Sequence, residues 1–177
     1  MRDGLIISAI GKDRPGIVDR LTGLVFEHGG NLEDSRMAIL GGEFSLMVLV
    51  TGSSDGLQTL EGTLPRVAEE LDLTVQIRPT RIEESTESEP PLPYRLNVVS
   101  MDHPGIVHRV SKLLAQRGVN VATLDTHLGF APTTGTPVFS LIMEVQIPAQ
   151  LPIAHLRGEL DTLAEEENLD LELRAQS

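Results

Sequence analysis

The sequence predicts an α+β protein built from two tandem βαββαβ modules, each a four-stranded antiparallel sheet with two helices on one face. Two observations carry this prediction. First, an eight-residue stretch occurs twice, at 11–18 and 100–107, and each copy joins an apolar run to an amphipathic segment. Second, the elements that follow each copy come in the same order, with the apolar spacings of helices and strands in turn.

An internal repeat covers most of the chain. After one constant shift, identical residues coincide across the two halves: Pro15 with Pro104, Gly16 with Gly105, Arg20 with Arg109, Gly29 with Gly118 and Asn31 with Asn120. A short insertion later, Phe44 falls on Phe139. A repeat that runs nearly end to end indicates a tandem duplication, so one fold is expected twice.

Each unit opens with an apolar strand, over about 5–11 and 94–101. A helix follows at about 15–28 and 104–117, and we predict its proline at the first helical position, where a missing N–H leaves no hydrogen bond unmade. The apolar residues of these helices have the spacing of one helical face: Ile17, Val18, Leu21, Leu24 and Val25, repeated by Ile106, Val107, Val110, Leu113 and Leu114.

Glycines mark the boundaries of the next elements. Gly29-Gly30 and Gly118 are expected to end the first helices, as glycine commonly does just after a helix. The second strands then start at Asn31 and Asn120.

The third strand of each unit follows a hairpin. Gly41-Gly42 predicts a tight turn into a strand at 44–50. In the second unit the connection is longer, at 129–137, before a strand at 138–147.

A second helix and a last strand complete each unit. The helices are predicted at about 55–71 and 150–167, and the last strands alternate apolar and polar residues from Leu73 and Leu169. Together these elements describe the ferredoxin-like split βαβ motif twice.

The boundaries of the modules follow from composition. The first module is expected to span 1–83 and the second 94–177. Between them, the segment 84–93 is acidic and ends in prolines, which is typical of a linker that is stiff at one end.

Composition excludes several classes of function. The 177-residue chain has a net charge of −12, no cysteine and 3% aromatic residues. Acidity and scarce aromatics disfavour direct nucleic-acid binding, which needs a cationic face and stacking platforms. The absence of cysteine excludes disulfides and thiolate chemistry. No apolar run approaches the ~18 residues of a membrane helix and no signal pattern opens the chain, so we expect a soluble cytoplasmic protein.

The sequence offers no sign of catalysis. The five histidines have no compact metal-ligand spacing, and the common nucleophile, phosphate-loop and dinucleotide motifs are missing. We therefore expect no enzyme activity, no cofactor and no metal site.

The turn before each first helix is the candidate site. A helix N-terminus presents unpaired N–H groups and a partial positive charge, which suit a carboxylate. Gly16 and Gly105 let a ligand approach the backbone with no Cβ in the way. Asn31 and Asn120 carry side-chain carbonyls able to accept from an ammonium group, although asparagine also suits a left-handed strand start. A site that combines turn and asparagine needs a second unit alongside, because one unit does not bring the chain back to the turn.

The motifs match a known family. The pattern Asp-x-Pro-Gly-Ile-Val at 13–18, a helix ended by glycine, and Asn-Leu or Asn-Val opening the second strand resemble the ACT domain. That family has βαββαβ modules that bind small ligands, very often amino acids, and regulate metabolic enzymes or transcription. The first unit, with Asp13-Arg14 before Pro-Gly and the run 31–41, is similar to the glycine cleavage system transcriptional repressor family. Those proteins are two tandem ACT modules of about this length.

The resemblance implies where a ligand binds. ACT modules pair side by side into one sheet, and ligands lie between the first turn of one module and the second strand of its neighbour. Carried over by motif, the ligand-binding residues are Asp13, Arg14, Gly16, Ile17 and Asn31, with Asp102, His103, Gly105, Ile106 and Asn120. The second unit departs from the first, with Val119 in place of Gly30 and a longer hairpin, so the first site is the better match.

The resemblance also implies a function. The chain is expected to be an amino-acid-sensing regulator of glycine cleavage, with glycine or serine as its ligand. It would act through a protein partner, such as a transcriptional activator, rather than by binding DNA. Two alternatives stay open: a ligand-independent interaction protein, and an accessory regulatory subunit of an amino-acid or one-carbon metabolic enzyme. The modules could pair within one chain or across a homodimer.

Overall fold

The chain folds into two units with the same architecture. The computed structural model describes residues 2–82, 90–131 and 134–176. The chain divides into compact units at Met1–Thr86 and Glu87–Ser177, and the order βαββαβ occurs in each. The predicted fold class is therefore confirmed. Of the predicted linker 84–93, residues 84–89 lie outside the described residues, whereas Leu92 and Pro93 already belong to a strand.

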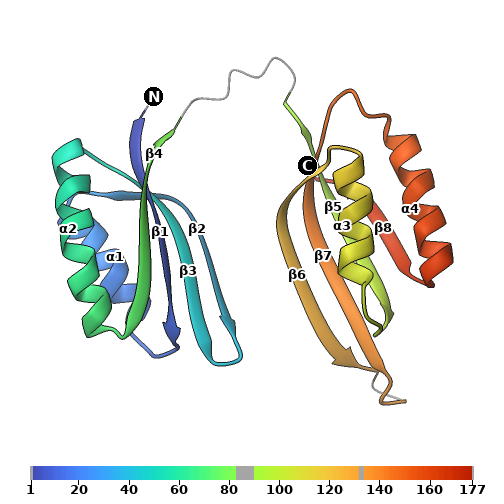
Figure 1. The fold of residues 1–177 in the computed structure, drawn as a ribbon, viewed down its shortest axis with the longest axis horizontal. Coiled ribbons are helices and arrows are strands. Elements are labelled where there is room, and N and C mark those ends of the chain that lie inside the picture. The colour runs from blue at the N-terminus through green and yellow to red at the C-terminus, as the bar shows by residue number, and fades with distance from the viewer. Residues whose placement is uncertain (1, 83–89, 132–133, 177) are drawn as a thin grey trace. The chain divides into compact units, whose positions relative to one another are not determined.

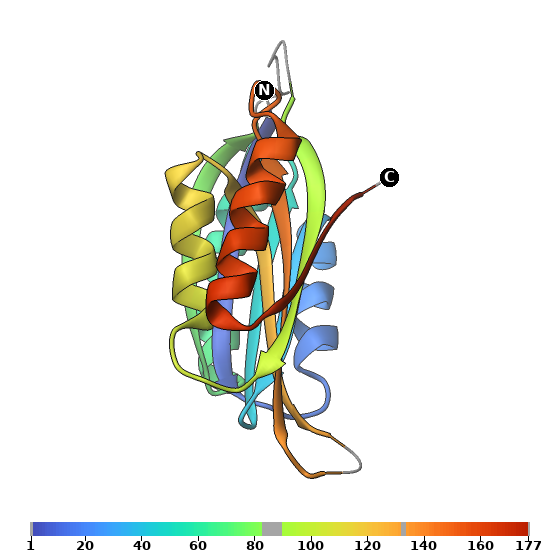
Figure 2. The same cartoon turned by 90° about the vertical axis from the view of Figure 1, so that its right-hand side faces the viewer.

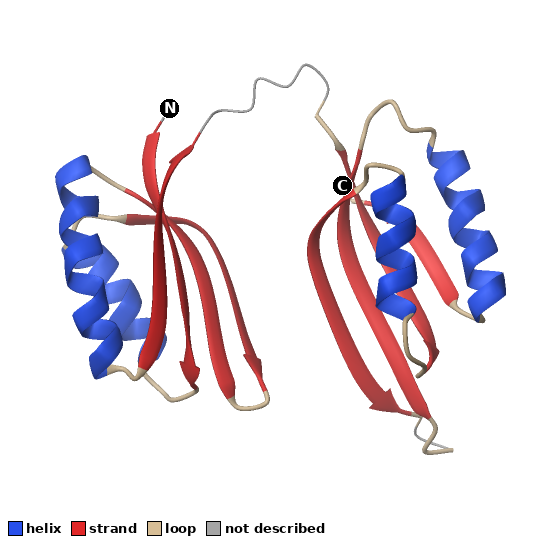
Figure 3. Cartoon of the chain, viewed as in Figure 1, coloured by secondary structure: helices blue, strands red, loops and turns tan. Residues whose placement is uncertain are grey.

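The elements of the first unit are close to those predicted. In chain order they are β1 Arg2–Lys12, α1 Ile17–Glu27, β2 Asn31–Leu40, β3 Glu43–Thr51, α2 Ser54–Glu70 and β4 Leu73–Ile82. The strands lie in the order β2-β3-β1-β4 and all neighbours are antiparallel. Both helices cover one face of this sheet (Figures 1 and 3).

The second unit repeats this arrangement. Its elements are β5 Leu92–Met101, α3 Ile106–Gln116, β6 Asn120–Phe130, β7 Pro137–Ile147, α4 Ile153–Glu167 and β8 Asp170–Ala175. The strand order is β6-β7-β5-β8, again antiparallel. Figure 2 shows α3 and α4 side by side over this sheet. Of the longer β6–β7 connection, Pro132 and Thr133 lie outside the described residues.

Each unit has its own hydrophobic core between sheet and helices. In β3 every second residue is buried, from Phe44 to Val50, and Leu60 and Leu64 of α2 pack against this side of the sheet. The second core repeats the pattern with other residues, and the two clusters share no member. Alternation along the strands and one-face spacing along the helices therefore account for both cores.

The glycine predictions are confirmed by the backbone. Gly29 and Gly118 follow α1 and α3 with φ of 68° and 67°, the left-handed conformation that ends a helix. Gly41 and Gly42 have φ of 61° and 83°, as the tightest hairpin turn requires.

The predicted start of the first helix is wrong by two residues. The helix begins at Ile17, and Gly16 before it has φ of 95° and ψ of −10°. A left-handed residue cannot be part of a right-handed helix, so Pro15 lies in the turn and not at the first helical position. The same correction holds for Pro104, because Gly105 has φ of 98°.

An ion pair joins the two helices of the second unit. The Arg117 guanidinium, just after α3, donates to both carboxylate oxygens of Glu159 on α4. These hydrogen bonds hold the pKa of Glu159 below its ordinary value. A carboxyl with a lowered folded-state pKa stabilises the fold above its unfolded pKa, and this stabilisation is lost as the pH falls through the folded-state pKa.

Glu159→Gln is therefore expected to lower the melting temperature of the second unit slightly near pH 7 and to have a smaller effect at about pH 3.5, which is below the ordinary glutamate pKa of about 4.3. Circular dichroism of the full chain at both pH values measures this difference. Glu165→Gln, at an exposed position of the same helix, serves as the control. An equal loss of stability at the two pH values would show that the ion pair does not cause the effect.

Candidate ligand site at the strand–helix turns

The turn between β1 and α1 is held by backbone contacts. The Asp13 N–H donates to the Gly42 carbonyl over 3.1 Å, which fixes the turn to the β2–β3 hairpin. The Gly16 carbonyl accepts from the Arg20 N–H over 3.0 Å and so makes the first hydrogen bond of the helix. The left-handed conformation of Gly16 turns the chain sharply from strand to helix.

The backbone at this turn is open. Apart from Gly16 itself and its two chain neighbours, no described residue has an atom within 4 Å of the position that a Cβ of Gly16 would take. No described side chain caps α1, so the N–H groups of its first turn keep their donor capacity. Their partial positive charge favours an anion at this point, as the sequence predicts.

Basic side chains surround the first turn. The Arg14 Nη2 donates to the Glu70 carbonyl over 3.3 Å, at the end of α2. The Arg20 Nη2 lies 3.9 Å from the Glu70 Oε2, a long and partly exposed ion pair. Two guanidinium groups therefore lie near the open N-terminus of α1, and both are anchored to the same residue.

The turn of the second unit has the same backbone hydrogen bonding, but a side chain lies next to its glycine. The Asp102 N–H donates to the Pro137 carbonyl over 3.4 Å, as Asp13 does to the hairpin of the first unit. A Cβ on Gly105, however, would lie 3.5 Å from the Arg109 Nε. Arg109 pairs with Glu167 of α4, so its guanidinium is held across this turn. The first turn is open and the second is partly covered.

The predicted site residues differ in what they expose. Asp13, Arg14 and Gly16 are exposed, as are Asp102 and Gly105, whereas His103 is half-buried.

The side chains of Ile17 and Ile106 are only 2% and 3% exposed and belong to the cores. These two residues can offer a ligand their backbone N–H groups alone.

The two asparagines lie at the other end of their sheets. Asn31 is opposite Thr51, whereas Gly11, next to the turn, is opposite Phe44 at the start of β3. Turn and asparagine therefore do not meet within one unit, as the topology predicts. Asn31 is exposed, and the Asn120 Nδ2 donates to the Gln146 Oε1 over 2.9 Å.

Two limits on other functions come from the same described ranges, 2–82, 90–131 and 134–176. Nowhere in them do three or more acidic or histidine side chains gather as a metal ion would need. None of the helices in these ranges has the length and apolar character to span a membrane.

Comparison with known proteins places the chain. The model of the ACT domain family matches residues 3–78. The glycine cleavage system transcriptional repressor of Escherichia coli (strain K12) is 32% identical over 166 residues, which are 93% of this chain and 85% of that protein. This chain belongs to the glycine cleavage system transcriptional repressor family.

Solved structures agree with membership of this repressor family. A crystal structure described as a candidate glycine cleavage system transcriptional repressor superposes with a TM-score of 0.74 at 26% identity, over 100% of this chain and 99% of the other. A protein of unknown function from Galdieria sulphuraria superposes with a TM-score of 0.79 at 30% identity over the whole of both chains. The family consists of regulatory proteins with ACT domains, and the tandem fold described above is theirs.

The site residues predicted from the sequence do not include Arg20 and Arg109, which distinguish the two turns. Arg20 and Arg109 occupy equivalent helix positions, and their partners Glu70 and Glu167 end the second helix of each unit. The signal was present in the repeat, where the two arginines coincide. Which acid each one meets depends on helix packing and could not be read from spacing.

Proposed function

We propose that this protein senses a small amino acid and regulates transcription of the glycine cleavage system from the cytoplasm through a protein partner. The observation that carries the proposal is the open turn at Gly16, where α1 has no side-chain cap hydrogen bond and a Cβ on Gly16 would meet only its chain neighbours. The relatives named as repressors of glycine cleavage support the regulatory role. Glycine is the first candidate ligand and serine the second.

The proposed ligand bridges two modules. Its carboxylate accepts from the N–H groups that follow Gly16, beside Asp13 and Arg14, and its ammonium group donates to the exposed Asn31 side chain of a neighbouring module.

The second unit offers an equivalent set of groups. The turn is formed by Asp102, His103, Gly105 and the Ile106 N–H. The hydrogen bond of Asn120 to Gln146 uses its Nδ2 and not its Oδ1. Because Arg109 lies across this turn, binding there has to displace or share a guanidinium already paired with an acid. The first site is therefore expected to bind more tightly.

Ligand binding can regulate only by favouring one arrangement of the protein over another. A ligand that bridges two modules meets this requirement. It binds only when the turn of one module lies next to the asparagine of the other. The acidic surface fits a route through a protein partner, since a net charge of −12 opposes contact with DNA phosphates.

Isothermal titration calorimetry of the full chain with a panel of amino acids tests the proposal. We expect saturable heat with glycine or serine and weaker or no binding of amino acids with large side chains. A panel without any binding would overturn the sensor function and favour a ligand-independent interaction protein.

Co-purification from the host, with and without the bound amino acid, tests the route of regulation. The set of captured proteins should change with the ligand. A mobility shift of the control-region DNA by the protein alone at low salt would instead establish direct DNA binding and overturn this part of the proposal.

A further inference from the structure

The sheet face that the helices of the first unit leave uncovered carries an ordered set of side chains. The strand register places three rows across it, from β2 through β3 and β1 to β4. The rows are Asp34–Leu49–Ile6–Arg78, Arg36–Met47–Ser8–Gln76 and Ala38–Ser45–Ile10–Thr74. We call this surface the open face.

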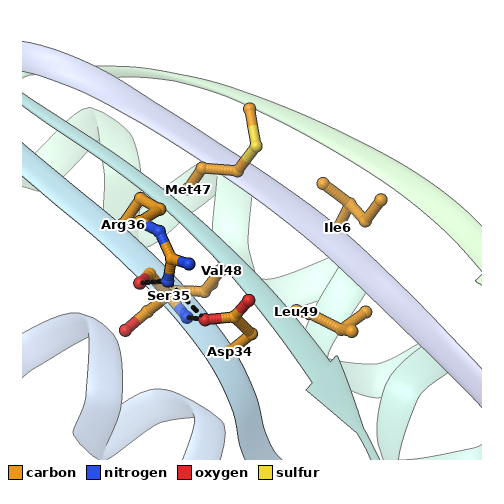
Figure 4. Close-up of a pocket in the computed structure, with 7 residues that line it drawn as sticks. All are labelled: Ile6, Asp34, Ser35, Arg36, Met47, Val48 and Leu49. Atoms are coloured by element: carbon orange, nitrogen blue, oxygen red, sulfur yellow. Dashed lines mark hydrogen bonds and ion pairs between the residues drawn. The ribbon is translucent and has the colours of Figure 1, made fainter. Parts of the chain in front are cut away.

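The middle of the open face is apolar and hollowed. A hollow of about 140 Å³ is lined by Ile6, Met47 and Leu49, and Asp34 and Arg36 lie along its β2 side, 2.6 Å apart as an ion pair (Figure 4). Met47 is 54% exposed. Large apolar side chains grouped on a surface and rimmed by charges are typical of a protein interaction site.

The duplication supplies an internal comparison. The positions that match Ile6 and Leu49 in the second unit are Arg95 and Glu144, which form an ion pair of 3.3 Å between β5 and β7. Gln176 also donates to Glu144 over 3.2 Å. The second unit satisfies these positions with its own polar groups, whereas the first unit leaves them apolar.

We propose that the open face is a homodimer interface, covered in solution by the open face of a second copy of this chain. The proposal is independent of the ligand site at the turns. It rests on the symmetry of the rows, because a two-fold axis that runs along the strands, between β1 and β3, exchanges the two ends of each row.

This operation matches the side chains of the first row. Leu49 of one copy then faces Ile6 of the other, and Asp34 faces Arg78. At the end of the face near the β2–β3 hairpin, where Lys12 is paired with Glu43 across β1 and β3, the same axis sets each of them opposite the other in the second copy. In the first row apolar groups meet apolar groups and opposite charges meet, whereas the other two rows set Met47 opposite Ser8 and Ile10 opposite Ser45, without like charges. Opposite charges across an interface favour this partner over a neutral surface.

The same operation suits the second unit less well. It would set Glu144 opposite Arg95, which is favourable, but it would also set Asp125 opposite Glu172, because these residues end the next row of that sheet. Like charges placed face to face disfavour association. The first unit has no such like-charge pair in its three rows, and it has the apolar pair Ile6 and Leu49 where the second unit has Arg95 and Glu144. We therefore place the dimer contact on the first unit.

The size of the open face predicts a weak dimer. Four strands about 4.8 Å apart and three rows about 7 Å apart cover roughly 400 Å² per copy, well below the about 800 Å² of a stable interface. We therefore expect a dimer that forms at high protein concentration.

Sedimentation equilibrium of the full chain over a wide concentration range tests the proposal. The average mass is expected to rise from the monomer value of 19.2 kDa toward twice that value. Met47→Arg should raise the dimer Kd by about tenfold or more, because a charge would be desolvated on an apolar surface. Ile142→Arg, at the matching position of the second unit, should leave the dimer Kd unchanged.

Charge reversal tests the two-fold axis itself. Asp34→Arg and Arg78→Asp should each weaken the dimer, since both place like charges opposite one another, and the double variant should restore it. A chain that stays monomeric throughout, equal effects of the two arginine variants at 47 and 142, or a double variant no better than either single would overturn the interface. Amino-acid binding by Met47→Arg should match the parent, so failure of this proposal and failure of the sensor function are separately visible.

Discussion

Replacing Phe44 by alanine is expected to destabilise the first unit by about 3–5 kcal/mol and to leave unfolding of the second unit unchanged. Phe44 is 1% exposed and belongs to the first core, which shares no residue with the second. Its removal leaves a cavity that the sheet cannot close. A loss of this size is a large part of the total stability of a small domain.

Hydrogen exchange read by mass spectrometry measures this prediction in the full chain, because peptides report on each unit separately. Peptides of the first unit should lose protection and those of the second should keep it. Phe139→Ala is the matched control, since Phe139 holds the same place in β7 but is only half-buried. It should cause a smaller loss, confined to the second unit. Loss of protection in both units of either variant would show that they unfold as one.

Gly16→Val is expected to raise the Kd for the amino acid ligand by at least about tenfold. A β-branched side chain at φ of 95° strains the turn and places two methyl groups where the ligand would approach the backbone. The first unit should remain folded, because a position with open space around it adds strain of about 1–3 kcal/mol but no core clash. Calorimetry measures the Kd, and circular dichroism verifies the fold.

Gly29→Val separates strain from ligand contact. Gly29 is also left-handed, with φ of 68°, and no described residue other than its chain neighbours has an atom within 4 Å of its Cβ position. It follows the far end of α1. This variant should lose similar stability and keep the affinity of the parent. If Gly16→Val binds the amino acid as the parent does while still folded, the ligand does not bind at this turn.

Local signals in the sequence predicted most of the fold. Glycine pairs, the helical spacing of apolar residues and the alternation of apolar and polar residues in strands are each visible within a few residues. Because the sequence is duplicated, the elements predicted for one half could be compared with those of the other. The start of α1 was misplaced because Pro15 suits either a turn or a first helical position, and only the conformation of Gly16 decides between them.

The candidate site and the open face were less accessible from the sequence. Turn and asparagine could be named, but the acids that hold Arg20 and Arg109 come from a different helix, so no spacing along the chain reveals them. Likewise, Ile6 belongs to a continuous apolar run in which the residues on the uncovered face look the same as those of the core. Only pairing with Leu49 across the sheet shows that they form a surface.

The position of Arg109 has a consequence for how a cell would use this protein. If the open turn fills at a low amino-acid concentration and the covered turn only at a higher one, the chain does not act as a simple threshold detector. Its occupancy would rise in two steps, and the regulatory output could be graded over a wide range of metabolic supply. Two copies of one module that differ in one arginine contact would therefore let a single chain respond to a wider range of amino-acid concentrations.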